Sequence, residues 1–462
     1  MKTITKLLTV ALFGSMLGLS SCCTEMDTPE VLQAYLEYHH PKTVAVKGYD
    51  AYFDLSDGML SAYQDPAINN CIKSIVNKVT GNDNCKGVFT LKNSEISQSE
   101  LRQTELYNYI LDSKSYQTQA PIEKTLEKIV AKNNGALVIT DFEEYVGGQI
   151  QQQNYAKKYF IDWLKKGNRI VFYIFDYKEN GKDKHLYVTV FDTPDHLLMK
   201  ETEDALKGNG ASYKIFSLNN DDVVFQVPYP AVTVGGTYHD ESGEDIISCM
   251  NESGEGDSYT LYNGLNAEYY PFEESWTNIV TNVRDAKEPD SSYKPQFQHL
   301  ISGLKVYFKR MSGYNVSKLD ILISDVQDDY DKFYGYYDFK KNGNNAGDDG
   351  KVLSEYDYEK QGATIAPVSD MFAFTGSVKD NVADISIDFR SGFSGVVANM
   401  PPTDMLRVDV VITGCEPKYD LLPSLFEWQG NRSLVEAIKN TLQDQNPKGK
   451  VIYSYFIKSL SE

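Results

Sequence analysis

The chain has 462 residues and a mass of 52.1 kDa, so more than one domain is expected. Hydrophobic residues make up 41% of the sequence and charged residues 24%, a composition typical of a globular protein that buries a core. The formal net charge of −20 excludes a broad nucleic-acid-binding surface, because phosphate binding requires a basic surface.

The first 21 residues have the features of a secretory signal peptide. Two lysines precede the apolar run Leu7–Leu19, which is too short to span a bilayer as a permanent helix. The run ends in Leu19-Ser20-Ser21-Cys22, which resembles the lipobox of bacterial lipoproteins. We therefore predict that Cys22 is lipidated and that acyl chains anchor the protein to the membrane. The alternative is an ordinary signal peptide with incidental cysteines.

The residues that follow Cys22 indicate which membrane carries the anchor. The next residue is Cys23 rather than Asp, so the inner-membrane retention signal of Gram-negative lipoproteins is not matched. The acidic residues Glu25, Asp27 and Glu30 resemble the surface-export context of Bacteroidetes lipoproteins. The sequence thus predicts an outer-membrane lipoprotein, facing either the periplasm or the cell surface, with residues 22–43 as a mobile polar tether.

Residues 44–228 alternate between strand-like and helix-like segments. The predicted strands are 44–55, 87–91, 136–141, 169–176 and 185–191, and the predicted helices are 66–79, 121–132 and 150–166. Residues 136–141 and 169–176 are continuous apolar runs, which are typical of buried parallel strands. We therefore predict an α/β domain of three layers around a mostly parallel sheet.

Residues 229–462 have a different pattern, in which short alternating runs are separated by Gly-rich and acidic turns. The clearest runs are 304–309, 319–326, 383–389 and 406–412. Their spacing predicts an all-β sandwich, with one helix at 433–443 and a final strand at 451–457. Cys71 and Cys85 are expected to lie too far apart for a disulfide, whereas a Cys249–Cys415 pair stays open.

Residues with oxygen-bearing side chains lie at the ends of several predicted elements. Asp54 and Ser56 follow the first strand, Thr118 precedes the second long helix, and Asp141 ends the strand 136–141. Ligands of an open parallel sheet bind at the carboxyl ends of its strands, so these residues form a candidate site. Carboxylates and hydroxyls are hard ligands, and the expected ion is therefore Mg²⁺ or Ca²⁺.

The order of these parts resembles a von Willebrand factor A domain with its metal-ion-dependent adhesion site. That family carries D-x-S-x-S after its first strand, a Thr before a helix and an Asp after a later strand. The matching residues here are Asp54, Ser56, Thr118 and Asp141. The sequence departs from the family at Gly58, which replaces the second serine, and at Phe142, which replaces a turn glycine. The resemblance implies that a protein partner would complete the ion's shell with its own carboxylate.

The function that the resemblance implies is binding or adhesion at the cell envelope, without catalysis. One alternative is a structural envelope scaffold with a degenerate metal site and a tyrosine-rich C-terminal binding surface. Another is a haloacid-dehalogenase-like phosphatase, because the sequence of residues 53–60 (FDLSDGML) resembles that family's nucleophile motif. The phosphatase is disfavoured, since Ser56 stands where the proton-donating Asp should be.

Overall fold

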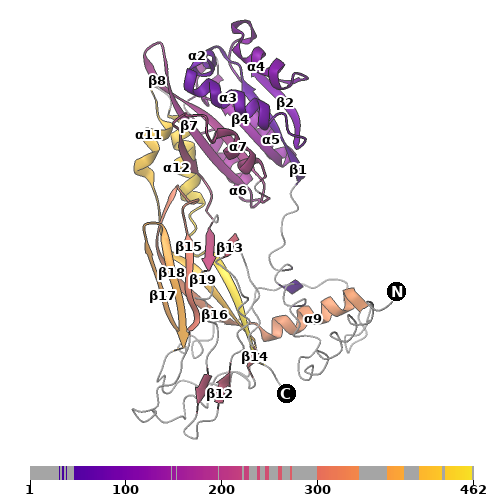
Figure 1. Ribbon diagram of the computed structural model, residues 1–462, viewed down its shortest axis with the longest axis vertical. Helices are drawn as coiled ribbons and strands as arrows, with labels where there is room; N and C mark the ends of the chain where they lie inside the picture. The colour runs from indigo at the N-terminus through magenta and orange to yellow at the C-terminus, as the bar shows by residue number, and fades with distance from the viewer. Residues whose placement is uncertain are drawn as a thin grey trace, which may run out of the picture.

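The structure is a computed structural model in which most of the chain after residue 45 is described. The described residues are Val31, Ala34, Tyr35 and Tyr38, and the ranges 46–227, 237–239, 245–248, 259–262, 271–272, 299–342, 372–389, 405–428 and 432–459, except 147, 152, 196 and 221–222. The signal peptide and Cys22 lie outside them. Figure 1 shows two bodies, one built on each of two large sheets.

The upper body contains a seven-stranded sheet in the order β3-β2-β1-β4-β8-β7-β9. Its strands are β1 (Val46–Asp54), β2 (Cys85–Lys92), β3 (Glu95–Ser99), β4 (Asn134–Thr140), β7 (Arg169–Glu179), β8 (Lys182–Asp192) and β9 (Lys214–Ser217). Only β1 pairs in parallel with its neighbours, β2 and β4. The other four pairings are antiparallel.

The prediction of a mostly parallel sheet is therefore wrong, because only two of the six pairings are parallel and both edges of the sheet are antiparallel. β7 and β8 form a hairpin whose turn residues, Asn180 and Gly181, both have positive φ angles. Asn-Gly favours this two-residue turn, because both residues tolerate the left-handed region. Strand β7 is a continuous apolar run and is buried on both faces. Such a run indicates burial, but it does not indicate whether the neighbouring strands are parallel or antiparallel.

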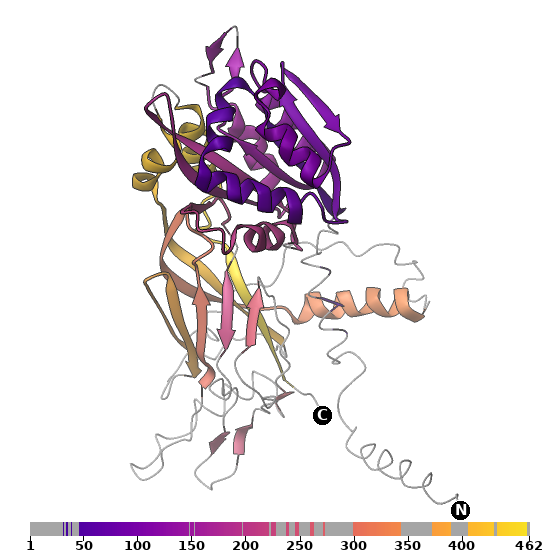
Figure 2. The same cartoon turned by 45° about the horizontal axis from the view of Figure 1, so that its top comes forward.

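Helices cover both faces of this sheet (Figure 2). One face carries α2 (Leu60–Gln64), α3 (Pro66–Lys78), α4 (Gln103–Leu111) and α7 (Leu197–Leu206). The other carries α5 (Ile122–Lys132), α6 (Ala156–Leu164), α11 (Leu422–Phe426) and α12 (Ser433–Asp444). None of the described helices is long and apolar enough to cross a membrane.

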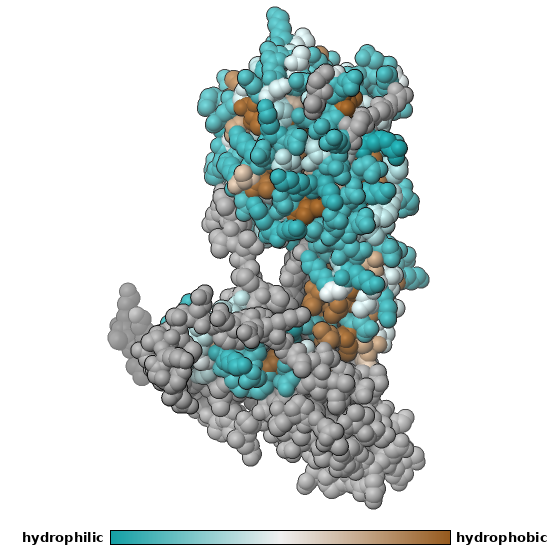
Figure 3. Space-filling view, turned by 180° about the vertical axis from the view of Figure 1, so that it is seen from behind, coloured by the Kyte–Doolittle hydropathy of each residue, from teal (hydrophilic) through white to brown (hydrophobic). Residues whose placement is uncertain are grey.

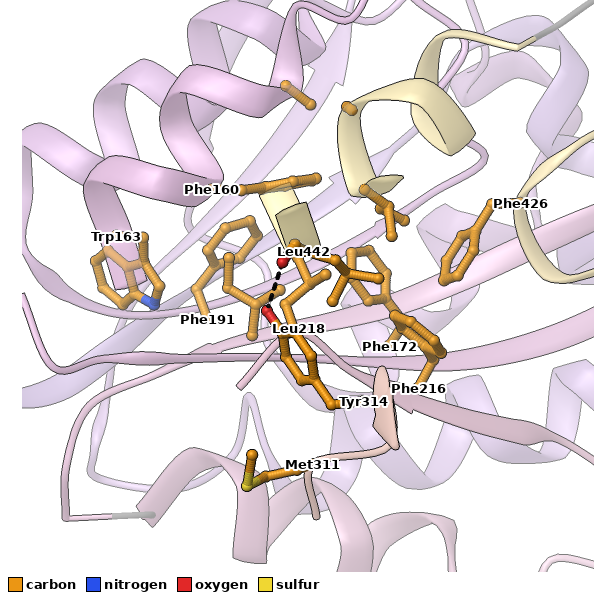
Figure 4. Packing of buried hydrophobic residues seen from close by; sticks show 14 of the residues in the cluster. Phe160, Trp163, Phe172, Phe191, Phe216, Leu218, Met311, Tyr314, Phe426 and Leu442 are labelled. Atoms are coloured by element: carbon orange, nitrogen blue, oxygen red, sulfur yellow. Dashed lines mark hydrogen bonds between the residues drawn. The ribbon is translucent and has the colours of Figure 1, made fainter. Parts of the chain in front are cut away.

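The C-terminal helix α12 was expected in the second domain, yet it packs on α6 of the first. Figure 4 shows the aromatic cluster that joins the two parts. The ring of Phe426 lies 5.2 Å from that of Phe172 and 5.1 Å from that of Phe216. Tyr314 donates its hydroxyl to the carbonyl of Leu442 at 3.1 Å. The two bodies thus share one hydrophobic core.

The lower body contains a nine-stranded sheet in the order β13-β10-β15-β18-β17-β16-β19-β20-β14. Its strands are β10 (Val224–Val227), β13 (Tyr259–Tyr262), β14 (Pro271–Phe272), β15 (His299–Tyr307), β16 (Tyr314–Asp325), β17 (Phe372–Lys379), β18 (Val382–Phe389), β19 (Met405–Pro417) and β20 (Val451–Ser459). The sheet is antiparallel except at β14–β20. β16 and β17 pair only at Lys318 and Ser377, and the sheet curls (Figure 1).

The expected two-sheet sandwich is thus one curled sheet in the part of the chain that the structure describes. Alternation of apolar and polar residues marks a half-buried strand, and it is the same in a sandwich and in a curled sheet. Among the described cysteines, Cys71, Cys85 and Cys415 are buried free thiols, and Cys249 lies outside the description. Seen from behind, the surface of the upper body is mainly hydrophilic, and apolar residues gather over the described part of the lower body (Figure 3).

Candidate functional site

Asp54 and Asp141 lie at the carboxyl ends of the neighbouring parallel strands β1 and β4. They are 1% and 2% exposed. The hydroxyl of Thr140 donates to Asp54 Oδ2 at 2.7 Å, and the main-chain N–H of Ser56 donates to Asp54 Oδ1 at 2.8 Å. Three of the four predicted site residues, Asp54, Ser56 and Asp141, are therefore gathered at one edge of the sheet.

The fourth predicted residue, Thr118, makes a different contact. The chain next to it does approach the site, because Gln117 forms a parallel bridge with Ser56. The side chain of Thr118 is nevertheless exposed, and its Oγ1 donates at 3.1 Å to Oδ1 of Asn93 in the β2–β3 turn. The structure thus pairs Thr118 with Asn93 and not with the buried carboxylates.

A buried lysine that belongs to none of the sequence motifs lies among the carboxylates. The ammonium Nζ of Lys184 is 2.7 Å from Glu143 Oε1, 2.7 Å from Glu179 Oε2 and 3.9 Å from Asp141 Oδ2. The same atom lies 4.7 Å from the ring centre of Trp428, which follows α11. We call Asp54, Asp141, Glu143, Glu179 and Lys184 the acidic edge.

One sequence signal could have located Lys184. The Asn180-Gly181 pair predicts a hairpin turn, and a hairpin over residues 169–192 would place Tyr177 opposite Lys184, as the structure does. Both strands have 11 residues. The turn end of the hairpin therefore brings Glu179 and Lys184 to the carboxyl end of β4.

Burial and charge give the two aspartates unusual proton affinities. Burial raises the pKa of Asp54 to about 6, although hydrogen bonds from Ser56 and Thr140 oppose the rise. Burial also raises the pKa of Asp141 well above its ordinary value, and the nearby charges of Glu143 and Asp54 raise it further, against the effect of Lys184. Asp141 therefore keeps a proton at pH values where an exposed aspartate has lost it.

Lys184 stays charged in this environment. Burial by itself would lower its pKa, but the carboxylates of Asp141, Glu143 and Glu179 outweigh burial and raise it. The lysine therefore carries a permanent positive charge inside the acidic edge.

Two buried tyrosines border the same carboxylates. The hydroxyls of Tyr63 and Tyr177 are buried and lack a hydrogen-bond partner among the described residues. Burial raises the pKa of both hydroxyls, and the charges of Asp54 and Asp141 contribute to each rise. Both tyrosines are therefore neutral O–H donors beside the two aspartates.

Gly58 leaves room at the position of the missing serine. A Cβ placed on Gly58 would be 3.7 Å from Glu179 Oε1, 3.8 Å from Lys184 Nζ and 3.9 Å from Asp141 Oδ2. These are ordinary contacts, so a small side chain would fit and would face the acidic edge. Within the part of the chain that the structure describes, no three His, Cys, Asp or Glu side chains are arranged to hold a metal ion.

The geometry also bears on the phosphatase alternative. A nucleophilic carboxylate needs an oxygen that a substrate can reach. Both oxygens of Asp54 accept hydrogen bonds from within the chain, and the residue is 1% exposed. This environment suits a structural or ion-binding carboxylate better than a nucleophile.

Comparisons with protein families, curated proteins and solved structures yield no match for this chain.

Proposed function

We propose that the protein is an outer-membrane lipoprotein, anchored through Cys22, that acts by binding a protein partner and not by catalysis. Its acidic edge contains a cation of its own, Lys184, so partner binding does not require a divalent cation. This corresponds to an envelope scaffold whose metal site is degenerate.

The position of Lys184 carries this proposal. A buried cation paired at 2.7 Å with both Glu143 and Glu179 supplies the charge that a bound metal would otherwise supply. Thr118 contacts Asn93 instead of the buried aspartates, so the family's third ligand is not gathered at the edge. The acidic edge therefore has a counter-ion of its own and a reduced ligand set.

A cation-dependent adhesion module, as the von Willebrand factor A resemblance implies, is the second candidate. It is favoured by the raised pKa values of Asp54 and Asp141 and by the buried hydroxyls of Tyr63 and Tyr177, which lack partners among the described residues. A Mg²⁺ or Ca²⁺ ion would take the place of the protons on the aspartates. Asp54, Ser56 and Asp141 would hold it, and a carboxylate from the partner would complete its shell.

Calorimetric titration of Mg²⁺, Ca²⁺ and Mn²⁺ into residues 23–462 separates the two candidates. We expect no saturable heat at millimolar ion in the wild-type protein. Saturable binding that is lost in Asp54→Ala would establish the second candidate instead. Asp57→Ala is the matched control, because Asp57 is an exposed carboxylate in the same turn.

Partner binding is tested in intact cells by cross-linking and recovery of the protein with and without EDTA. The same partners should be recovered in both conditions. Partners that disappear with EDTA would contradict the cation-independent proposal. A phosphoester hydrolysis assay should show no activity that depends on Asp54.

The anchor is tested by fractionation and fatty-acid labelling of two cysteine variants. Cys22→Ala should lose both the acyl label and membrane association. Cys23→Ala, the neighbouring cysteine, should keep both. Normal labelling of Cys22→Ala would contradict the anchor.

A further inference from the structure

A short segment of the expected tether is docked on the lower body. Val31, Ala34, Tyr35 and Tyr38 are helical, and their spacing places them on one face of a helix. Val31 is 3% exposed and Tyr35 is 1% exposed. We call these four residues the strap.

The strap packs against α9 (Gln327–Asn342), the helix that follows β16. The ring of Tyr35 lies 5.4 Å from that of Tyr330 and 5.3 Å from that of Phe333, both at edge-on angles. The hydroxyl of Tyr35 donates to Asp329 Oδ2 at 2.5 Å. One strap residue thus combines aromatic packing with a charge-assisted hydrogen bond to the first turn of α9.

A second strap tyrosine extends this contact along α9. The ring of Tyr38 lies 5.6 Å from Phe333 and 5.6 Å from Tyr336. Tyr330 and Phe333 are 0% and 2% exposed in the resulting cluster. The strap therefore covers the aromatic face of α9 from Tyr330 to Tyr336, which is about two turns.

The position of α9 makes this contact relevant to the orientation of the molecule. Figures 1 and 2 show α9 projecting sideways from the lower body. Helix α2 follows directly on the turn after Asp54 and lies at the top of the upper body in Figure 1. The acidic edge therefore lies at the end of the upper body that faces away from the lower body, and α9 belongs to the lower body.

We propose that the strap fixes the lipid anchor to α9 and so orients the protein with its acidic edge facing away from the bilayer. This inference rests on the lipidation of Cys22 in the proposed function. Cys22 precedes Val31 by nine residues, which span at most about 30 Å when fully extended. A docked strap thus holds α9, and with it the lower body, within about 30 Å of the membrane surface and leaves the acidic edge of the upper body open to a partner.

Docking of the strap on α9 is tested by hydrogen exchange on a protein of residues 23–462. This protein lacks Cys22, so the result does not depend on lipidation. Tyr35→Ala should speed amide exchange in both the strap and α9 by at least about tenfold. Tyr35→Phe, which removes only the hydrogen bond to Asp329, should have a smaller effect. Tyr419→Ala is the control, because Tyr419 is 37% exposed on another element. Unchanged exchange of α9 in Tyr35→Ala would overturn the proposal.

Orientation is tested with the lipidated protein in phosphatidylethanolamine–phosphatidylglycerol vesicles that carry an acceptor dye on their headgroups. A fluorescent amino acid replaces Lys341 at the end of α9 in one sample and Asp57 beside the acidic edge in another. We expect strong energy transfer from position 341, weak transfer from position 57, and weaker transfer from 341 in Tyr35→Ala. Equal transfer from both positions, or no effect of Tyr35→Ala, would overturn the orientation. Protein that does not float with the vesicles would contradict the anchor itself, whereas the exchange result would stand.

Discussion

The ammonium of Lys184 and the carboxylate of Glu143 are 2.7 Å apart, although one belongs to β8 and the other to the chain that follows β4. With Glu179 on the other side at 2.7 Å, this pair gives a cluster of buried acids its own cation. The ion pairs of Lys184 therefore contribute to the stability of the upper body.

Replacing Lys184 should strongly destabilise the upper body. Lys184→Met keeps most of the side-chain volume but leaves Glu143 and Glu179 without their partner. Removing one member of a buried ion pair costs about 3–5 kcal/mol, because the other charge stays buried. Urea unfolding at pH 7 measures the loss. Lys207→Met, which breaks an exposed pair with Asp204, should leave the midpoint unchanged, and equal effects of the two variants would refute the role assigned to Lys184.

Asp54 should make the protein less stable as the pH rises. Its folded pKa of about 6 is above its unfolded value, so the folded state holds the proton more tightly. This contribution to stability is complete below about pH 4, which is near the unfolded pKa, and is lost as the pH rises through about 6.

Asp54→Asn, which mimics the protonated acid, should therefore match the wild type at pH 4 and exceed its stability by about 2–3 kcal/mol at pH 8. Urea midpoints at the two pH values test this difference. Asp57→Asn is the matched control, because Asp57 is an exposed carboxylate in the same turn. If the difference in unfolding free energy between Asp54→Asn and the wild type were the same at both pH values, the raised pKa of Asp54 would be contradicted.

Phe426 should be a main contributor to the junction at which α11, from the C-terminal part of the chain, packs on the sheet of the upper body. It is 1% exposed, and its ring stacks on Tyr187 at 5.7 Å in addition to contacting Phe172 and Phe216. Phe426→Ala should cost about 3–5 kcal/mol, since it leaves a cavity in the shared core. Thermal denaturation monitored by calorimetry measures this loss of unfolding free energy. Leu421→Ala is the control, since Leu421 is 41% exposed just before α11. A loss of stability in Phe426→Ala that is no larger than the loss in Leu421→Ala would show that the junction depends on other contacts.

Gly48 should be required by close packing as well as by its backbone angle. Its φ is +105°, and an added Cβ would lie 2.8 Å from the carbonyl oxygen of Asn84 and 2.7 Å from Lys86 Cε. Gly48→Ala should cost at least about 2 kcal/mol, because strain at φ and the clash with the main chain combine. Gly208→Ala isolates the effect of φ, since Gly208 has φ +79° with nothing within 4 Å, and should cost about 1 kcal/mol. Equal thermal midpoints for the two variants would exclude the clash.

Local signals predicted much of the upper body. Helix α3 spans Pro66–Lys78 where residues 66–79 were expected, and α12 spans Ser433–Asp444 where 433–443 were expected. For α3 the signals are Pro66 at the first helical position, Asp65 accepting hydrogen bonds from the first turn, and apolar residues at helical spacing. Asp54 and Asp141 were correctly expected at one edge, because parallel neighbours end on the same side of a sheet.

The sequence by itself determined where the main helices and strands lie and which acids follow β1 and β4, because periodicity and capping act over a few residues. Only the tertiary structure decided the single curled sheet and the packing of α12 on the upper body, since an alternating strand pattern does not specify which element the strand packs against. The same holds for Lys184, whose contacts Glu143, Glu179 and Trp428 come from three separate parts of the chain. A buried charge takes its role from what surrounds it, and those surroundings exist only once the distant parts have packed together.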